Sequence, residues 1–368
     1  MLILNTPKQY VREENILAKT AEYVKGANGK VLIVSGKTAF EQVKAPVITS
    51  LVTHAVDYEI FYFTGYATHH TIQQIIEKGQ QIGATSLIGI GGGSALDSAK
   101  AAAEHLGAPI ITIPTIAATC AAWTALSVIY SENGETIDFI RLNNSPEAIL
   151  VDPNILVQAP VRYLQAGIAD TLVKWYEFAP YINEEHYEFA FTTSLHNAKL
   201  AIQILETHSL QATKDNENQQ VTRAFLQVID AVLALAGLVG SIQGDSYKEP
   251  LAHALHNKLT YFPETHHTLH GEKVIFGLIV QFFLEKKEEK EIEAFIHYLA
   301  ELKQPVTLTQ LGFTENSEDA IQQLARLLTH EQKTATFPQP LTAELVETAI
   351  YKADALGQQI LYAKEQTI

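Results

Sequence analysis

Residues 84–130 read ATSLIGIGGGSALDSAKAAAEHLGAPIITIPTIAATCAAWTALSVIY, and this stretch decides the fold. The apolar run at 87–90 predicts a strand that is buried on both faces. The glycines at 91–93 let the backbone turn sharply and come close to a ligand, because they carry no Cβ. Ser94 is expected to cap a helix that starts at Ala95. The first-turn amides of that helix would face the glycine turn, which predicts an anion site suited to phosphate.

The glycine turn approximates the pattern G-x-G-x-x-G, with Gly89, Gly91 and Ser94 in the three places. Alone, this match is as consistent with an ordinary glycine-rich turn as with a nucleotide site. The turn lies far from the chain start, and no Asp or Glu follows about 20 residues later to hold a ribose. The stretch therefore predicts a phosphate-binding fold that differs from the usual dinucleotide fingerprint.

Apolar segments and amphipathic helices alternate around this stretch. Strands are predicted at 30–35, 59–63, 109–113 and 148–153, and helices at 13–25 and 71–82. Because strand, helix and strand alternate without a recognised hairpin signal, the sheet should be mostly parallel and covered on both faces. Ligands of such sheets bind at the carboxyl ends of the strands.

The pattern changes near residue 159, where long amphipathic stretches rich in alanine and leucine begin and continue to the C-terminus. The predicted fold class is an α/β N-terminal domain with a mostly parallel sheet plus an all-α C-terminal domain. We place a nucleotide-binding domain at 1–157 and a helical metal-binding and catalytic domain at 158–368.

Composition narrows the classes of partner. The chain has 368 residues, 47% of them hydrophobic, and a formal net charge of −15. This charge argues against nucleic acid and against an anionic membrane surface, and so favours a small-molecule substrate. No apolar run of about 18 residues suggests a membrane span, and the chain is expected to be cytoplasmic. The single cysteine, Cys120, excludes an internal disulfide framework, so any metal must bind His and carboxylate ligands.

Asp170 lies in AGIADTLVKW, His253 and His256 lie one turn apart in LAHALHN, and His270 lies in HHTLHGEK. A carboxylate with two imidazoles is a sound ligand set for zinc or ferrous iron. The spacing alone proves little, because the chain has 14 histidines. A single histidine is more often a surface or core residue.

Several ordered motifs carry a resemblance: GIGGGSALDSAK, PTIAATCAAWTALSVIY, AGIADTLVKWYE, AHALHN and HGEKVIFG. Together they resemble the iron-containing alcohol dehydrogenase superfamily, and within it the glycerol dehydrogenase branch and the hydroxycarboxylate dehydrogenases. The resemblance covers nearly the whole chain. It implies a dehydroquinate synthase-like fold with an active site between the two domains, where a hydride passes between a nicotinamide cofactor and a carbonyl carbon.

The same resemblance implies roles for individual residues. The metal ligands would be Asp170, His253 and His270. The pyrophosphate and neighbouring groups would contact Gly91, Gly92, Gly93, Ser94 and Asp97. The nicotinamide side would be lined by Thr115, Thr119, Thr124, Leu126 and Tyr130. His256 is a candidate proton relay, or else a helix histidine bonded to a nearby carbonyl.

Three positions depart from the glycerol dehydrogenases that the chain resembles. Gly36 stands where those enzymes carry an Asp that binds the adenosine ribose, so Gly36 with Lys37 favours NADP and leaves NAD open. Cys120 stands where they carry an Asp that contacts the polyol, and it is expected to be a small packed residue in the substrate region rather than a nucleophile. Lys174 replaces a further histidine of other branches. It either binds a substrate carboxylate or forms a structural salt bridge to Asp170 or Glu177.

These departures favour a metal-dependent oxidoreductase of small 2-oxo and 2-hydroxy acids. The alternatives are an NAD-dependent glycerol or polyol dehydrogenase, a dehydroquinate synthase-type lyase and a non-catalytic binding protein. The lyase would need basic residues around its substrate, and the loop 117–125 has none. A homo-oligomer is expected, and zinc and iron stay equally open as the metal.

Overall fold

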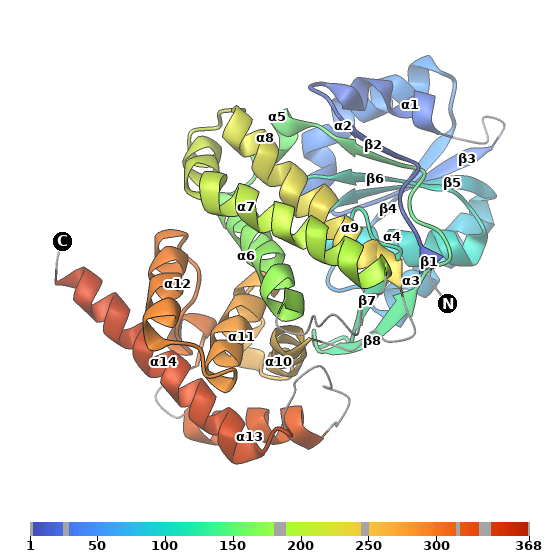
Figure 1. Cartoon of the computed structure of the whole chain (residues 1–368). Helices are drawn as coiled ribbons and strands as arrows, with labels where there is room; N and C mark the ends of the chain where they lie inside the picture. The colour runs from blue at the N-terminus through green and yellow to red at the C-terminus, as the bar shows by residue number, and fades with distance from the viewer. Residues whose placement is uncertain are drawn as a thin grey trace.

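The computed structural model of the chain describes residues 3–24, 29–179, 189–243, 250–313, 317–330 and 340–366. A parallel sheet forms its N-terminal region (Figure 1). The strands are β2 (Gln9–Arg12), β3 (Lys30–Ser35), β4 (Tyr58–Tyr62), β5 (Ala84–Gly91), β6 (Ile110–Pro114) and β9 (Ala148–Val151), in the order β2-β9-β6-β5-β3-β4. Every neighbouring pair in this six-stranded sheet is parallel, as predicted.

Helices cover both faces of the sheet because successive side chains of a strand point to opposite faces. Val31 and Ile33 of β3 pack with α2 (Lys37–Thr53), whereas Leu32 and Val34 pack with α3 (His69–Ile82) and α4 (Gly93–Leu106). The chain moves outward from β3 in one direction to β4 and from β5 in the other to β6. The carboxyl ends of β3 and β5 therefore form the point where ligands of such sheets bind.

The sequence analysis recognised no hairpin in the N-terminal region, and this was wrong. Strands β7 (Leu126–Tyr130) and β8 (Thr136–Arg141) pair antiparallel as a hairpin outside the main sheet. Its turn contains Asn133 and Gly134, and Gly134 has φ +93°, which a glycine adopts without strain. Asn-Gly between two strand-forming runs is a strong hairpin signal that the sequence analysis missed.

The helix predicted at 13–25 was also wrong in length. Residues Ile16–Lys19 form a 3₁₀ turn (η1) and Thr20–Tyr23 form the short helix α1. Asn15, directly before η1, is left-handed with φ 60°, which prevents a helix from continuing through it. Residue Lys25 lies outside the described part of the chain.

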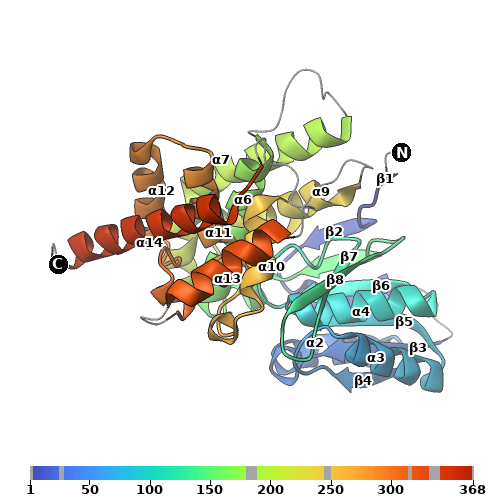
Figure 2. The same cartoon turned by 90° about the horizontal axis from the view of Figure 1, so that it is seen from below.

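Helices form the region after the sheet, which confirms the predicted fold class (Figures 1 and 2). They are α5 (Pro153–Leu156), α6 (Val161–Phe178), α7 (Phe189–Glu217), α8 (Arg223–Asp230), α9 (Ala236–Ser241), α10 (Leu251–Leu259), α11 (His270–Leu284), α12 (Glu289–Glu301), α13 (Ser317–His330) and α14 (Ala343–Glu365), with a π-helical segment η4 (Ala231–Leu235) between α8 and α9. Short strands β1 (Ile3–Leu4) and β10 (Ile242–Gln243) pair antiparallel and tie the N-terminus to this region.

Residues Arg223–Ser241 are long and apolar enough to cross a membrane by length and composition. However, 56% of the apolar window is buried inside the fold, and its helices contact α6 and α7. This is the pattern of a core helix in a soluble protein, and the side chains form part of the largest apolar core of the helical region.

Candidate active site

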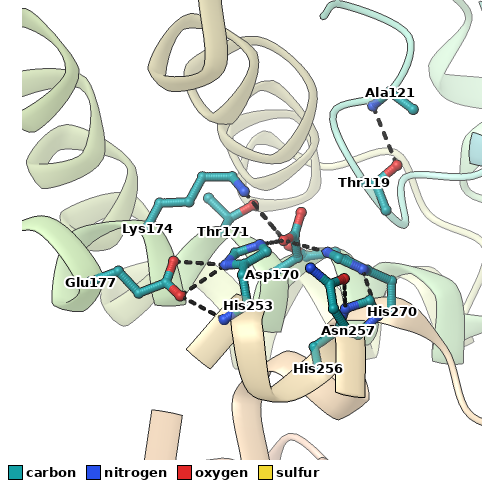
Figure 3. A network of polar contacts seen from close by, with 11 residues as sticks. Thr119, Ala121, Asp170, Thr171, Lys174, Glu177, His253, His256, Asn257 and His270 are labelled. Carbon is teal, nitrogen blue, oxygen red and sulfur yellow. Dashed lines mark hydrogen bonds and ion pairs between the residues drawn. The ribbon is translucent and has the colours of Figure 1, made fainter. Parts of the chain in front are cut away.

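Three helices bring the predicted metal ligands together. Asp170 lies in the middle of α6, His253 in the first turn of α10 and His270 at the start of α11. Gly271 lets α11 approach α6 closely, because a Cβ there would lie 1.9 Å from the carbonyl oxygen of Ala166 and 3.1 Å from the amide nitrogen of Asp170. The side chains of Asp170, His253 and His270 point toward one another (Figure 3).

Ligand atoms of Asp170, His253 and His270 all lie within 4.8 Å of one another. The Oδ1 atom of Asp170 is 3.5 Å from Nε2 of His253 and 3.2 Å from Nε2 of His270. One carboxylate oxygen and two imidazole nitrogens that converge on one point suit a divalent cation of the zinc or ferrous class. The residues present therefore fit the metal that the resemblance implies.

Glu177 orients His253, and the sequence analysis did not assign it this role. Its carboxylate contacts Nδ1 of His253 at 2.8 and 2.9 Å and accepts a hydrogen bond from the backbone amide of His253 at 3.0 Å. Because Glu177 holds a proton on Nδ1, Nε2 is the nitrogen that can bind a metal once it has lost its own proton. Glu177 lies seven residues after Asp170, two turns along the same face of α6, and this spacing was the available signal.

His256 lies behind His270 in an analogous arrangement. Its Nε2 is 3.0 Å from Nδ1 of His270, and its Nδ1 is 2.9 Å from Oδ1 of Asn257. With Asn257 as acceptor, His256 donates from Nδ1 and accepts from His270, so Nε2 of His270 is left free for a metal. His256 is buried, with 2% of its surface exposed. His256 is thus a helix histidine that is hydrogen-bonded to the side-chain carbonyl of Asn257, and the proton-relay role stays a prediction.

Burial and neighbouring charges set the protonation of the four groups. Burial alone would raise the pKa of Asp170, but Lys174 and the two histidines hold it well below its usual value. Burial would lower the pKa of His253, but Glu177 and Asp170 raise it to about 9. Burial lowers the pKa of both His256 and His270. His256 and His270 are therefore neutral at pH 7, whereas a metal must displace a proton from His253.

Lys174 lies one turn after Asp170 on α6 and forms an ion pair with it, Nζ to Oδ1, at 3.2 Å. Only 12% of the Lys174 side chain is exposed. Cys120 is half-buried, and its burial raises the pKa of the thiol while the charge of Lys174 opposes the rise. A protonated thiol fits the expectation that Cys120 is not a nucleophile.

The glycine turn lies at the carboxyl end of β5, with Gly91 at φ +137°. The helix cap is Gly92, not Ser94 as predicted, and Gly92 has no side chain that could accept from the first-turn amides. Ser94 lies in the first turn instead, where its carbonyl accepts a hydrogen bond from the hydroxyl of Ser98 at 2.8 Å. Gly93 is the first residue of α4, so the helix begins directly at the glycine turn, and residues 92–94 are half-buried.

Gly36 lies beside this turn, since Ser35 of β3 pairs with Ile90 of β5. Gly36 is the N-cap of α2. A Cβ added to Gly36 would meet no atom closer than the carbonyl oxygen of Phe63, at 3.9 Å. Lys37 begins α2 with its Nζ 5.9 Å from the centre of the Tyr62 ring.

Asp97 has a structural partner that the sequence analysis missed. Its Oδ1 pairs with buried Lys100 at 2.9 Å, and its Oδ2 accepts from the amide of Val128 at 3.2 Å. The Nζ of Lys100 also donates to the carbonyl oxygens of Thr124 and Leu126. These contacts fix the start of β7 against α4.

Among the residues predicted for the nicotinamide side, Thr115 contacts the glycine turn, whereas Tyr130 belongs to the β7–β8 hairpin. The amide of Thr115 donates to the carbonyl of Gly91 at 3.2 Å, and Thr119 accepts from the amide of Ala121 at 3.3 Å. Tyr130 ends β7, and its ring lies 5.7 Å from that of Tyr66.

Comparison with known proteins agrees with this arrangement. The sequence profile of the family described as iron-containing alcohol dehydrogenase matches residues 7–153. The chain is 36% identical to hydroxycarboxylate dehydrogenase A of Escherichia coli (strain K12) over 298 residues, which cover 80% of this chain and 81% of that protein. It is 32% identical to glycolaldehyde reductase of Halobacterium salinarum over 363 residues, which cover 97% and 98% of the two chains.

A solved structure supports the same conclusion. The crystal structure of glycerol dehydrogenase from Schizosaccharomyces pombe matches with a TM-score of 0.88 at 27% identity, covering 99% of this chain and 92% of that one. From this match and the sequence identities above, the chain belongs to the iron-containing alcohol dehydrogenase family.

Proposed function

We propose that this oxidoreductase reversibly reduces small 2-oxo acids to 2-hydroxy acids with a nicotinamide cofactor and one divalent metal. The observation that carries the proposal is Lys174. Its ammonium group lies 3.2 Å from the predicted metal ligand Asp170 and is mostly shielded from solvent. A cation there suits a substrate carboxylate next to the carbonyl that reacts.

A bound zinc or ferrous ion would supply Lewis-acid polarisation of the substrate carbonyl. Asp170, His253 and His270 would hold the ion, with Glu177 and His256 orienting the two imidazoles. Lys174 would orient the substrate through its carboxylate. Cys120 would bind the hydroxyl groups of a polyol poorly, since a thiol makes only weak hydrogen bonds.

For the cofactor we propose NADP, with NAD as the alternative. The pyrophosphate would bind at the N-terminus of α4, and the adenosine end would reach Gly36 at the adjacent strand end. Gly36 brings no carboxylate that would repel a 2′-phosphate, and Lys37 follows it. The residues proposed to line the nicotinamide side are Thr115, Thr119, Thr124, Leu126 and Tyr130.

A polyol dehydrogenase is the second candidate, because relatives called glycerol dehydrogenase match almost the full length of the chain. One from Citrobacter freundii is 30% identical over 98% of this chain and 99% of that protein. The placement of Cys120 and Lys174 favours the oxo acid. We further propose a cytoplasmic homo-oligomer and a domain boundary at 157/158, which falls between α5 and α6.

The test is oxidation of NADPH and NADH by metal-reconstituted protein with 2-oxobutanoate, 2-oxoglutarate and dihydroxyacetone. Asp170→Ala serves as the control for metal dependence. Turnover of 2-oxobutanoate with NADPH supports the proposal. Turnover of dihydroxyacetone with NADH, in the absence of oxo-acid turnover, contradicts it and supports the polyol dehydrogenase.

A further inference from the structure

Three side-chain nitrogen atoms lie close to a single carboxylate oxygen of the site. Oδ1 of Asp170 is 3.2 Å from Nζ of Lys174, 3.2 Å from Nε2 of His270 and 3.5 Å from Nε2 of His253. Oδ1 is also the carboxylate atom that lies nearest both imidazole ligand atoms. A cation held by these ligands therefore shares its oxygen with the ammonium group of Lys174, and both are positive.

The positive and negative charges around the ligand triad are unequal in number. Among the described residues, the charged side chains with contacts to the ligand triad are Lys174 and Glu177. With His253 in the neutral form that binds a metal, these two side chains and Asp170 carry one more negative than positive charge. A divalent ion reverses this balance and leaves one positive charge without a partner. An unpaired buried charge is costly, and the exposed fractions of Asp170 and Glu177 are only 3% and 1%.

We propose that Lys174 couples binding of the divalent ion to binding of a monocarboxylate, so that each raises the affinity of the site for the other. This inference rests on the proposed function and narrows its substrate class. The carboxylate of a 2-oxo acid draws the ammonium group away from Oδ1 and neutralises it. Without that anion, Lys174 repels the ion and lowers its affinity.

The coupling selects among substrates by charge. A monocarboxylic 2-oxo acid supplies the one negative charge that the loaded site lacks. A neutral polyol leaves Lys174 uncompensated, and a dicarboxylate brings a second negative charge for which the triad and its contacts offer no partner. Because coupling between two ligands is reciprocal, its size can be read from the metal alone.

The experiment measures Zn²⁺ affinity by competition with a chromogenic chelator, without nicotinamide. Each protein is tested alone, with oxamate, which is a carboxylate without a reducible ketone, and with neutral oxamide. The variants are Lys174→Met, Lys174→Arg and, as a matched control, Lys199→Met. Lys199 is an exposed lysine of α7 that lies against the Trp175 ring. Its removal changes net charge by the same amount.

We expect oxamate to raise Zn²⁺ affinity about tenfold in the natural protein, in Lys174→Arg and in Lys199→Met, with no effect of oxamide. Lys174→Met should bind Zn²⁺ more tightly than the natural protein in the absence of oxamate, and oxamate should add less than about twofold. An equal oxamate effect in Lys174→Met and the natural protein, or none in the natural protein, overturns the inference.

Failure of this inference and failure of the proposed function are distinguishable. The binding measurement involves no turnover, so it stands or falls separately from the substrate assay. Protein that couples oxamate to Zn²⁺ but reduces only dihydroxyacetone contradicts the proposed function alone. Protein that reduces 2-oxo acids without such coupling contradicts this inference alone.

Discussion

Glu177→Gln should weaken metal binding although Glu177 is not one of the proposed ligands. The carboxylate contacts Nδ1 of His253 with both oxygens, at 2.8 and 2.9 Å, and 1% of the side chain is exposed. Gln keeps the shape but loses the charge that holds the proton on Nδ1. Loss of such a partner typically costs about 10- to 100-fold in metal affinity. That corresponds to about 1.4–2.7 kcal/mol of binding free energy.

The loss should grow with pH. Glu177 helps to raise the pKa of His253 to about 9, so at pH 7.5 the need to lose the His253 proton lowers the metal affinity of the natural protein. Glu177→Gln lowers that pKa, so the penalty for losing the proton at pH 7.5 is smaller in the variant and offsets part of its loss of metal affinity. Above about pH 9 His253 has lost its proton in both proteins, so the variant shows the full loss of metal affinity that comes from a poorly oriented His253.

The assay is Zn²⁺ competition against a chelator at about pH 7.5 and about pH 9.5. Urea unfolding of the metal-free proteins checks that the variant folds. Glu206→Gln, which removes an exposed carboxylate of α7, is the matched control and should bind as the natural protein does. Natural affinity in Glu177→Gln at both pH values would refute the reasoning.

Three further predictions follow from the same geometry. Gly36→Asp has room for its Cβ and should lower kcat/KM for NADPH about 100-fold while raising it for NADH, and an unchanged cofactor ratio would contradict the proposed 2′-phosphate site. Lys100→Met leaves the buried carboxylate of Asp97 unpaired and should cost about 3–5 kcal/mol in urea unfolding, unlike the exposed control Lys44→Met. Because burial raises the pKa of Cys120, the rate of its labelling by iodoacetamide should rise at a higher pH in the folded protein than in the urea-unfolded protein. The same pH dependence in both forms would contradict this prediction.

The parts of the fold that local patterns specify were predictable. Strand β3 has its predicted bounds, Lys30–Ser35, because a polar or glycine residue ends an apolar run at each side. The glycine turn and the helix after it also agree, since Gly91 needs a positive φ. The hairpin β7–β8 was missed because Ile137 and Phe139 of β8 are exposed, so the strand lacks the buried alternation that usually marks one.

The site was predictable where residues act through their own chemistry. Asp170, His253 and His270 were identified by motif, and the structure brings them together. The role of Glu177 depends on its contact with His253 across α6 and α10, for which the seven-residue spacing from Asp170 was only an indirect signal. Ser94 was misplaced as a helix cap because the chain enters α4 two residues earlier than its polarity suggested.

The most direct test of the central claim compares 2-oxobutanoate with its neutral carboxamide, which has the same shape and no charge. The account predicts that the natural protein with NADPH and Zn²⁺ prefers the acid by about 100-fold in kcat/KM, and that Lys174→Met loses most of this preference. Equal kcat/KM for acid and amide in the natural protein would contradict the account. An acid preference that survives in Lys174→Met would also contradict it.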